Sequence, residues 1–256
     1  MTRDLFDRHL RALRRDRAAR IGPEMVLYDR AFQDCLERLR DIHRRFGRAL
    51  LIGCPTLEWP EQLRGIVDSI DVVDPGSDFS HAAAGIQVEE DRHDFGEDRY
   101  DLCVAIGTLD TVNDLPLALQ LIKRSLRKDA PFIGAIAGGN SLATLRASLI
   151  EAGRASGRIV ARSHPRIDPS SLAQLLTSAG FAMPVVDVDR VTLRYPDLQG
   201  LIRDLRSMGA TSVLDQRPPA FTKSEAFELT RAFSGAQANG RTEEIVEILH
   251  FLGWSQ

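Results

Sequence analysis

Short apolar runs alternate with segments of helical periodicity through residues 49–150. The runs Ala49–Ile52 and Phe132–Ile136 contain no polar residue, which is typical of strands buried on both faces of a sheet. Between such runs, apolar residues recur every three or four positions, as they do over 115–126, which predicts amphipathic helices. Strand and helix in alternation are typical of right-handed βαβ units, so the pattern predicts an α/β fold with a doubly wound, mostly parallel sheet.

The same periodicities give the expected elements along the whole chain. We expect strands at 49–52, 70–73, 86–88, 100–106, 132–136, 185–193 and 244–252, the sixth interrupted near Asp189. We expect helices at 24–45, 59–64, 115–126, 142–149, 171–179, 198–208 and 224–233. The strands of the last third lie far apart in the sequence and are expected to extend one edge of the sheet. The chain is therefore interpreted as one globular unit, with an N-terminal helical lid over 1–45 and an α/β domain over 46–256.

Composition limits the class of protein. The chain has 256 residues, of which 43% are hydrophobic, enough for a sizeable core. Its formal net charge of -3 gives no global preference for nucleic acid, and no apolar run approaches the roughly 20 residues of a membrane span. The three cysteines, Cys35, Cys54 and Cys103, are scattered, which argues against disulfide and zinc frameworks. Together with the lack of a secretory signal at the N-terminus, this predicts a cytoplasmic protein without a metal site.

The opening segment RDLFDRHLRALRRDR is basic and has apolar residues at helical spacing, namely Phe6, Leu10 and Leu13. Such a helix could meet an acidic partner or a lipid surface. The other interpretation is an amphipathic lid on its own domain, with its arginines in water. Aspartates interrupt the positive charge, which favours the second interpretation.

The residues that follow the predicted strands carry the candidate chemistry, since ligands of such sheets bind at the carboxyl ends of the strands. Gly53 and Cys54 follow the first strand, Asp74 ends the second, Glu89-Glu90-Asp91 follow the third, and Gly107 ends the fourth. A carboxylate at the second strand can accept both hydroxyls of a ribose, and acceptors after the third suit an adenine amine. An adenosine-containing ligand is the prediction.

Each of these residues also has a purely structural interpretation. Asp74 could form an Asp-Pro-Gly turn, the acidic run 89–91 could be a solvated loop, and Gly53 could serve a tight turn. Cys54 is interpreted as a small apolar residue, because no basic neighbour favours a thiolate. Asp110, in the loop after the fourth strand, is a candidate base. His164-Pro165-Arg166 could face a substrate, although an ordinary polar connection is the favoured interpretation.

The order of elements resembles that of class I S-adenosylmethionine-dependent methyltransferases. The stretch DTVNDLPLALQLIKRSLRKDAPFIGAIAGGNSLATLRASL is similar to the methyltransferase-fold assembly factors of mitochondrial complex I and their alphaproteobacterial relatives. So are FDRHLRALRRDRAA, LLTSAGFAMPVVDVDRVTLRYPDLQGLIRDLRSMGATSVL and the terminal LGW. A more distant resemblance is to the malonyl-carrier-protein methyltransferase of the biotin pathway.

The resemblance implies a seven-stranded Rossmann-like sheet and bound S-adenosylmethionine. For the assembly-factor branch it also implies a protein substrate, a respiratory complex I subunit, modified by arginine hydroxylation. Residue by residue, Gly53 matches the first glycine of the cofactor loop, Asp74 the ribose-binding acid, and Glu89 to Asp91 the adenine-side acid. The implied activity is that of an S-adenosylmethionine-dependent enzyme acting on a protein or small acceptor.

The chain departs from the family pattern around the cofactor loop. Leu51 stands where an acidic residue is usual, and Pro55 and Leu57 replace the second and third glycines. Asp110 and Thr111 replace the His and Trp of an LHW motif after the fourth strand. A leucine at position 57 predicts either a pocket that is partly filled or a loop on another path. The alternative function is therefore a catalytically degenerate binding or assembly factor for a complex I subunit.

Overall fold

The computed structural model describes residues 4–256; Arg3, part of the basic opening segment, lies outside them. The strands are β1 (Phe46–Ile52), β2 (Val67–Asp74), β3 (Ile86–Gln87), β4 (Leu102–Ile106), β5 (Pro131–Ala137), β6 (Phe181–Tyr195), β7 (Gln237–Ala238) and β8 (Arg241–Ser255). The helices are α1 (Arg8–Ile21), α2 (Val26–Asp41), α3 (Glu58–Leu63), α4 (Ser77–Ala82), α5 (Leu115–Ser125), α6 (Ala143–Ala155), α7 (Pro169–Ser178), α8 (Leu198–Ser207) and α9 (Lys223–Gly235), with a 3₁₀ turn η1 (Leu109–Thr111).

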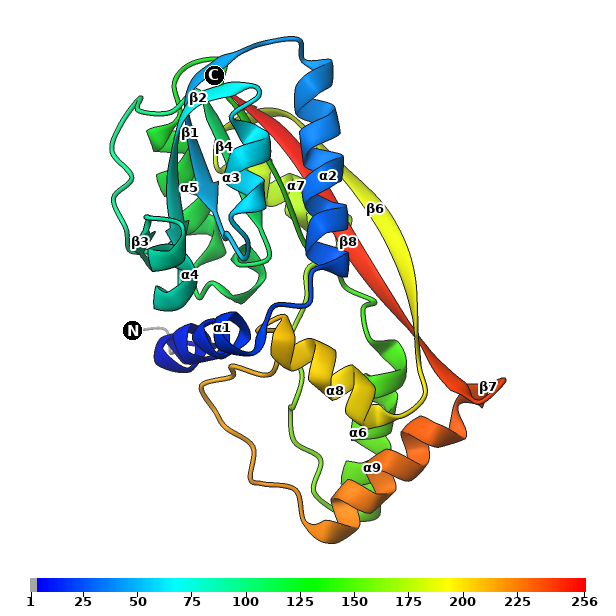
Figure 1. Ribbon diagram of the computed structural model, residues 1–256. Coiled ribbons are helices and arrows are strands. Elements are labelled where there is room, and N and C mark those ends of the chain that lie inside the picture. Colours follow the sequence, from blue (N-terminus) through cyan, green and yellow to red (C-terminus); the bar gives the residue numbers. More distant parts are fainter. Residues whose placement is uncertain (1–3) are drawn as a thin grey trace.

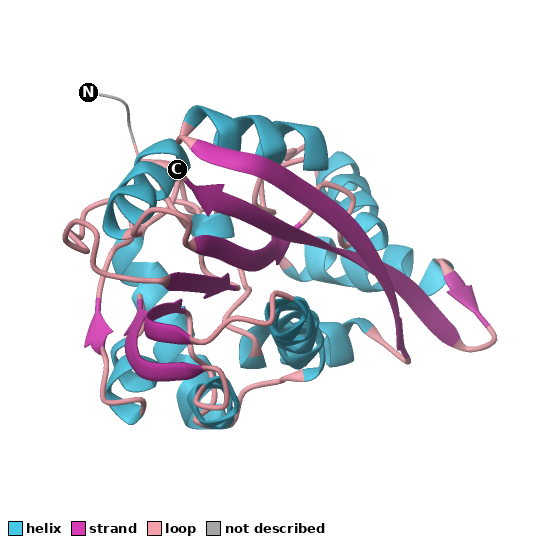
Figure 2. Cartoon of the chain, turned by 90° about the horizontal axis from the view of Figure 1, so that it is seen from above, coloured by secondary structure: helices cyan, strands magenta, loops and turns pink. Residues whose placement is uncertain are grey.

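The strands form one sheet in the order β3-β2-β1-β4-β5-β8-β6, and the short β7 pairs with β8 beside this path. The first five strands are parallel, whereas β8 runs antiparallel to both β5 and β6. Figures 1 and 2 show helices on both faces of this twisted sheet. The predicted doubly wound, seven-stranded path is confirmed, with its last two strands added at one edge.

The chain reverses its direction across the sheet between β1 and β4, which are neighbours although they are far apart in sequence. In open α/β sheets this switch point is where the loops after the strands separate and leave a crevice. The loops that follow Ile52 and Ile106 therefore flank the place where a ligand is expected.

Aromatic residues fill the core on each face of the sheet. On the face covered by α2 and α3, the ring of Phe32 stacks on Trp59 with centroids 4.7 Å apart, and both side chains are fully buried. On the face covered by α5 and α7, Phe132 contacts Phe181 and Phe251 with ring centroids 5.0 and 4.9 Å away. Both cores include side chains of the central strands, so they hold the strand ends in a fixed register.

Three details differ from the expected elements. The predicted interruption of the sixth strand near Asp189 is wrong: β6 continues through it, and the irregularity lies between Ala182 and Val185. The Asp189 carboxylate accepts hydrogen bonds from Arg30 on α2, so its charge does not break the strand. Helix α4 and strand β7 were not expected, because six- and two-residue elements are too short to show a period.

The two N-terminal helices take different positions. Helix α2 packs its apolar side chains into the core on one face of the sheet, whereas α1 lies across the lower rim next to α4 and α8 (Figure 1). Helix α1 therefore lies over the carboxyl ends of the strands, whereas most of α2 lies against one face of the sheet. The division of the chain at residue 45 stays a prediction. Within residues 4–256, none of the helices combines the length and apolar character that a membrane span needs.

Candidate functional site

Glycines allow the loops after β1 and β4 to meet closely. Gly53 has φ +82°, and a Cβ there would lie 2.3 Å from the carbonyl oxygen of Ile106. Gly107 has φ +71°, and a Cβ there would lie 2.3 Å from the ring of Tyr28 on α2. Both glycines therefore serve backbone conformation and close packing at the switch point, as the tight-turn interpretation of Gly53 predicts.

Asp74 ends β2 and is fully buried. Its carboxylate accepts four hydrogen bonds, two from the guanidinium of Arg15 at 3.1 and 2.5 Å, and two from the backbone N–H groups of Cys54 at 3.1 Å and Gly76 at 2.8 Å. Asp74 thus joins the loop after β1 to its own turn, and its two oxygens are engaged.

The acidic run after β3 is engaged in the same way. Glu90 is fully buried and accepts hydrogen bonds from both terminal nitrogens of Arg11, at 2.7 and 2.8 Å. Asp91 accepts two from Arg8, at 2.5 and 2.7 Å, and Glu89 accepts one from Arg8 at 3.1 Å. The acids from β2 and β3 are therefore gathered along one rim, as the sequence predicts, and the solvated-loop interpretation of 89–91 is wrong for Glu90 and Asp91.

The arginines that bind these acids all come from α1. Arg8, Arg11 and Arg15 are spaced three and four residues apart, so they share one face of the helix. The exposed fractions of Arg11 and Arg15 are 3% and 4%, which makes the expectation of arginines in water wrong for these two. A buried charge is tolerated only when it is paired, and the pairing acids lie 59 to 83 residues away in the chain.

The mutual effect on ionisation follows from burial and pairing. Burial lowers the pKa of Arg11 and Arg15, but the charges of Glu90 and Asp74 outweigh this and raise both above the ordinary arginine value. Burial opposes ionisation of Asp91, yet hydrogen bonds from Arg8 bring its pKa below the ordinary value. For Glu89 burial wins and its pKa is raised.

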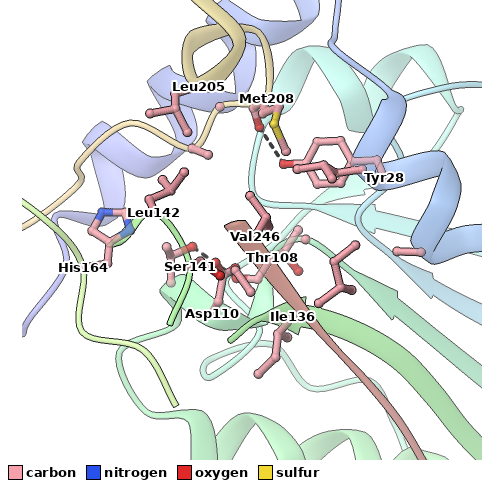
Figure 3. A pocket seen from close by; sticks show the side chains of 18 of the residues that line it. Tyr28, Thr108, Asp110, Ile136, Ser141, Leu142, His164, Leu205, Met208 and Val246 are labelled. Atoms are coloured by element: carbon pink, nitrogen blue, oxygen red, sulfur yellow. Dashed lines mark hydrogen bonds between the residues drawn. The ribbon is translucent and has the colours of Figure 1, made fainter. Parts of the chain in front are cut away.

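Next to this rim lies a cavity of about 110 Å³. It is enclosed by α1, α2, α8, the ends of β4 and β5, and β8, and Figure 3 shows its mostly apolar wall. Labelled wall residues include Ile136, Leu142, Leu205, Met208 and Val246. Arg11 and Arg15 line the cavity, whereas their acid partners lie behind them and are not among its described lining residues.

A few polar groups converge in this cavity. The hydroxyl of Thr108 is buried and has no hydrogen-bond partner within residues 4–256. Asp110, the candidate base, lines the same space and lies within electrostatic reach of His164 and Arg166. Tyr28 lines the opposite side, where its hydroxyl donates to the carbonyl oxygen of Met208 at 2.6 Å (Figure 3). An apolar cavity with a few convergent polar groups is the usual form of a small-ligand site.

His164 and Arg166 line the cavity, so this connection borders the space where a substrate would lie, and contact with a substrate stays a prediction. Nothing in the sequence signals this, because the loop 157–168 has no period that would place it beside β5. The backbone N–H of Val213 donates to Nε2 of His164 at 2.8 Å, which fixes the neutral ring with its proton on Nδ1.

The ionisation of His164 provides a test of this polar cluster. Burial lowers its pKa below the ordinary 6.5, while the charge of Asp110 acts to raise it and that of Arg166 to lower it. We therefore expect Asp110→Asn to lower the pKa of His164 further and Arg166→Gln to raise it, as measured by the NMR titration of the imidazole protons. A His164 pKa that is the same in both variants and the unmodified protein contradicts the arrangement.

Comparison with known proteins identifies the fold family. A model described as "Methyltransferase domain" matches residues 25–184, more than half of the chain. The chain belongs to the methyltransferase-domain family. It is 30% identical over 271 residues to "Arginine-hydroxylase NDUFAF5, mitochondrial" of Rattus norvegicus, covering 98% of this chain and 77% of that protein. It is 26% identical over 163 residues to a malonyl-[acyl-carrier protein] O-methyltransferase of Halorhodospira halophila, covering 62% and 54%.

Solved structures agree on the fold of this methyltransferase-domain protein. The YcgJ protein of Bacillus subtilis matches with a TM-score of 0.60 at 12% identity, covering 88% of this chain and 99% of that one. A phosphoethanolamine N-methyltransferase of Haemonchus contortus, solved with S-adenosylhomocysteine, matches with a TM-score of 0.50 at 12% identity, covering 83% and 49%. The resemblance seen in the sequence is confirmed, and structural neighbours of this fold bind S-adenosylmethionine or its product.

The departures of this methyltransferase-domain protein from the family pattern have structural outcomes. Leu57 is 52% exposed at the start of α3, so the prediction that it partly fills the pocket is wrong. Cys54 is buried, and burial raises the pKa of its thiol to about 12, which agrees with a small apolar role. Thr111 accepts a hydrogen bond from Nε of Arg11 at 3.1 Å, so it helps to anchor α1.

The residue types at the strand ends of this methyltransferase-domain protein suit an adenosine ligand, since buried carboxylates stand at the end of β2 and after β3. Their oxygens, however, are engaged by α1. Fully buried Asp74 already accepts four hydrogen bonds, and Glu90 accepts two. The residues thus suit the cofactor, and in this conformation arginines take the contacts that it needs.

Proposed function

We propose that this chain is an S-adenosylmethionine-dependent protein that modifies a group held in the cavity beside the strand ends. The observation that supports this most directly is the position of Asp74 at the end of β2, beside the switch point, directly behind Arg15 and before Pro75, which both line that cavity. Asp74, Glu90 and the backbone around Gly53 and Gly107 are the residues that would hold the nucleoside. The cofactor, when bound, supplies an electrophilic methyl group.

The cavity residues supply binding and orientation of the acceptor. Apolar walls such as Leu142 and Val246 exclude water, and alignment of the reacting groups accounts for most of the rate of a methyl transfer. Asp110 is the group placed to accept a proton from the acceptor, and the unpaired hydroxyl of Thr108 offers a hydrogen bond in the same space. Of the named relatives, the malonyl-[acyl-carrier protein] O-methyltransferase suggests a carboxylate oxygen as the methyl acceptor. The arginine-hydroxylase carries out a different reaction, to which the methyl group of the cofactor would not contribute, so methyl transfer is the step proposed here.

Thermal unfolding of the full chain with S-adenosylmethionine or S-adenosylhomocysteine tests this proposal. Ligand at about 100 times its dissociation constant stabilises a protein by roughly 2.7 kcal/mol, which for this size raises the Tm by about 5–10 °C. We expect Asp74→Asn to lose most of this rise. Asp71→Asn, on the same strand but paired with Arg48, is the matched control and should retain it. The absence of any rise at millimolar concentrations of either ligand overturns the proposal.

A second candidate function is that of a binding or assembly factor without catalysis, with a respiratory complex subunit as partner. The engagement of Asp74 and Glu90 by α1 favours this alternative, because it closes the nucleoside position. The two functions differ in their dependence on the cofactor, so the thermal unfolding experiment separates them.

We also propose a cytoplasmic location, because the cysteines are scattered and none of the three forms a disulfide.

A further inference from the structure

Three arginines on one face of α1 each bind a different carboxylate of the rim. From the start of the helix, Arg8 pairs with Asp91, Arg11 with Glu90 and Arg15 with Asp74. All three are paired through two guanidinium nitrogens, the geometry that suits a carboxylate best. Along the helix the acids therefore follow in the reverse of their order in the chain, with Asp91 first and Asp74 last.

Helix α1 not only binds the carboxylate oxygens of these acids but also fills the space next to them. A Cβ at Gly76, in the turn after β2, would lie 2.5 Å from Cβ of Arg15, so the helix packs directly on this turn. Arg11 also donates to the carbonyl oxygen of Thr108 at 2.8 Å, in the loop after β4. Helix α1 therefore closes the rim from β2 to β4, where a nucleoside would lie.

The attachment of α1 is mostly polar and separate from the main cores. Leu10 of the helix and the preceding Phe6 form a small cluster with Val213 and Leu214, and Arg15 lies over the ring of Phe79 on α4. The segment that follows the helix begins with Gly22, at φ +90° with open space around it, and Pro23. No residue of α1 belongs to either of the two main cores of the sheet, so displacement of the helix would leave those cores intact.

We propose that α1 and an adenosine-containing ligand bind the same carboxylates in turn, so that α1 is an internal competitor of the cofactor. This inference rests on the proposed function. When α1 is docked on the rim, as in the structure described here, its guanidinium groups donate to Asp74 and Glu90. They take the place that the ribose hydroxyls and the adenine amine of the ligand would have. The measured affinity for the ligand is then the intrinsic affinity multiplied by the fraction of molecules with α1 displaced. A partner that binds displaced α1 would raise this affinity.

Hydrogen exchange of the unmodified full chain gives the first test. With S-adenosylhomocysteine at a saturating concentration, the backbone amides of residues 8–21 should exchange faster than without it, because bound ligand keeps α1 away from the rim. Helix α5, on the far side of the switch point, should not change. Slower or unchanged exchange in α1, with the ligand shown by calorimetry to be bound, overturns the inference and leaves the proposed function standing.

A matched pair of variants gives the second test. The Kd for the ligand should fall if α1 competes with the ligand and rise if α1 helps to bind it. Arg8→Gln weakens the α1 contact at a partly exposed position, whereas Arg20→Gln changes an arginine of the same helix whose pair with Asp78 lies at the surface. We expect Arg8→Gln to lower the Kd for S-adenosylhomocysteine by about 3- to 10-fold, the change that an ordinary net hydrogen-bond contribution gives at this partly exposed position, and Arg20→Gln to leave it unchanged.

The outcomes distinguish the two proposals. If Arg8→Gln binds as well as or more weakly than the unmodified protein, α1 does not compete, and the inference is wrong. If neither the unmodified protein nor either variant binds S-adenosylhomocysteine at about 1 mM, any Kd is weaker than roughly 1 mM. The proposed function then fails, and the inference fails with it. Tighter binding by Arg8→Gln alone supports both.

Discussion

Replacement of Arg15 by alanine should lower the free energy of unfolding by about 3–5 kcal/mol, the usual cost of removing one partner of a buried ion pair. Asp74 is fully buried, and without Arg15 its carboxylate keeps only the N–H groups of Cys54 and Gly76 as donors. The remaining negative charge then has no counter-ion at a position that is fully buried in the unmodified protein. Urea unfolding followed by circular dichroism measures the change.

Two further variants show whether the loss comes from the unpaired charge. Arg20→Ala removes an exposed arginine from the same helix and should leave the unfolding curve where it is. The double variant Arg15→Ala with Asp74→Asn removes both charges, and we expect it to recover a large part of the stability. A loss for Arg15→Ala as small as that for Arg20→Ala would show that Arg15 and Asp74 are not paired in a buried site.

The central sheet could be predicted from the sequence because its strands are buried on both faces. Uninterrupted apolar runs such as Ala49–Ile52 leave few other structures open, and the helices between them have clear periods. The edge strand β6 was harder to predict. In β6 more and less exposed residues alternate, and the half-buried Asp189 was mistaken for a break although Arg30 of α2 pairs with it.

The rim acids could be predicted, but their partners could not. Topology brings the ends of parallel strands to the same edge, and this places Asp74 near Glu90 without any knowledge of side chains. The pairing with Arg11 and Arg15 depends instead on how α1 docks, and a basic helical segment is equally consistent with arginines in water. Buried ion pairs between distant segments leave no local pattern.

Among the cavity residues, those that follow a regular strand could be predicted from the sequence, and those in an irregular loop could not. Asp110 follows a clear strand and was singled out for that reason, whereas His164 and Arg166 belong to a loop with no period. Their positions are set by packing of that loop beside β5 and by the hydrogen bond from Val213 to His164. Replacement of the family glycine by Leu57 was expected to matter for the pocket, but the side chain turns to solvent at the start of α3.

Replacement of Gly53 by alanine should destabilise the protein by about 2–5 kcal/mol. An alanine at φ +82° adopts a left-handed conformation, which costs roughly 1–2 kcal/mol. In addition, its Cβ would lie 2.3 Å from the carbonyl oxygen of Ile106 and 2.9 Å from Cγ2 of Thr108, and relief of such overlap in a packed interior typically costs about 1–3 kcal/mol. The loops after β1 and β4 would have to separate, which chemical unfolding detects as a lower midpoint.

Gly157 provides the matched control for this prediction. It has φ +68°, and a Cβ there would meet nothing within 4 Å, so Gly157→Ala has the conformational cost without the overlap. We expect a loss of about 1–2 kcal/mol for Gly157→Ala, smaller than that for Gly53→Ala. Equal losses would mean that the loops after β1 and β4 do not approach each other as closely as the fold requires. Because those loops flank the switch point, their separation would also alter the position of Asp74, which Cys54 holds through its backbone N–H.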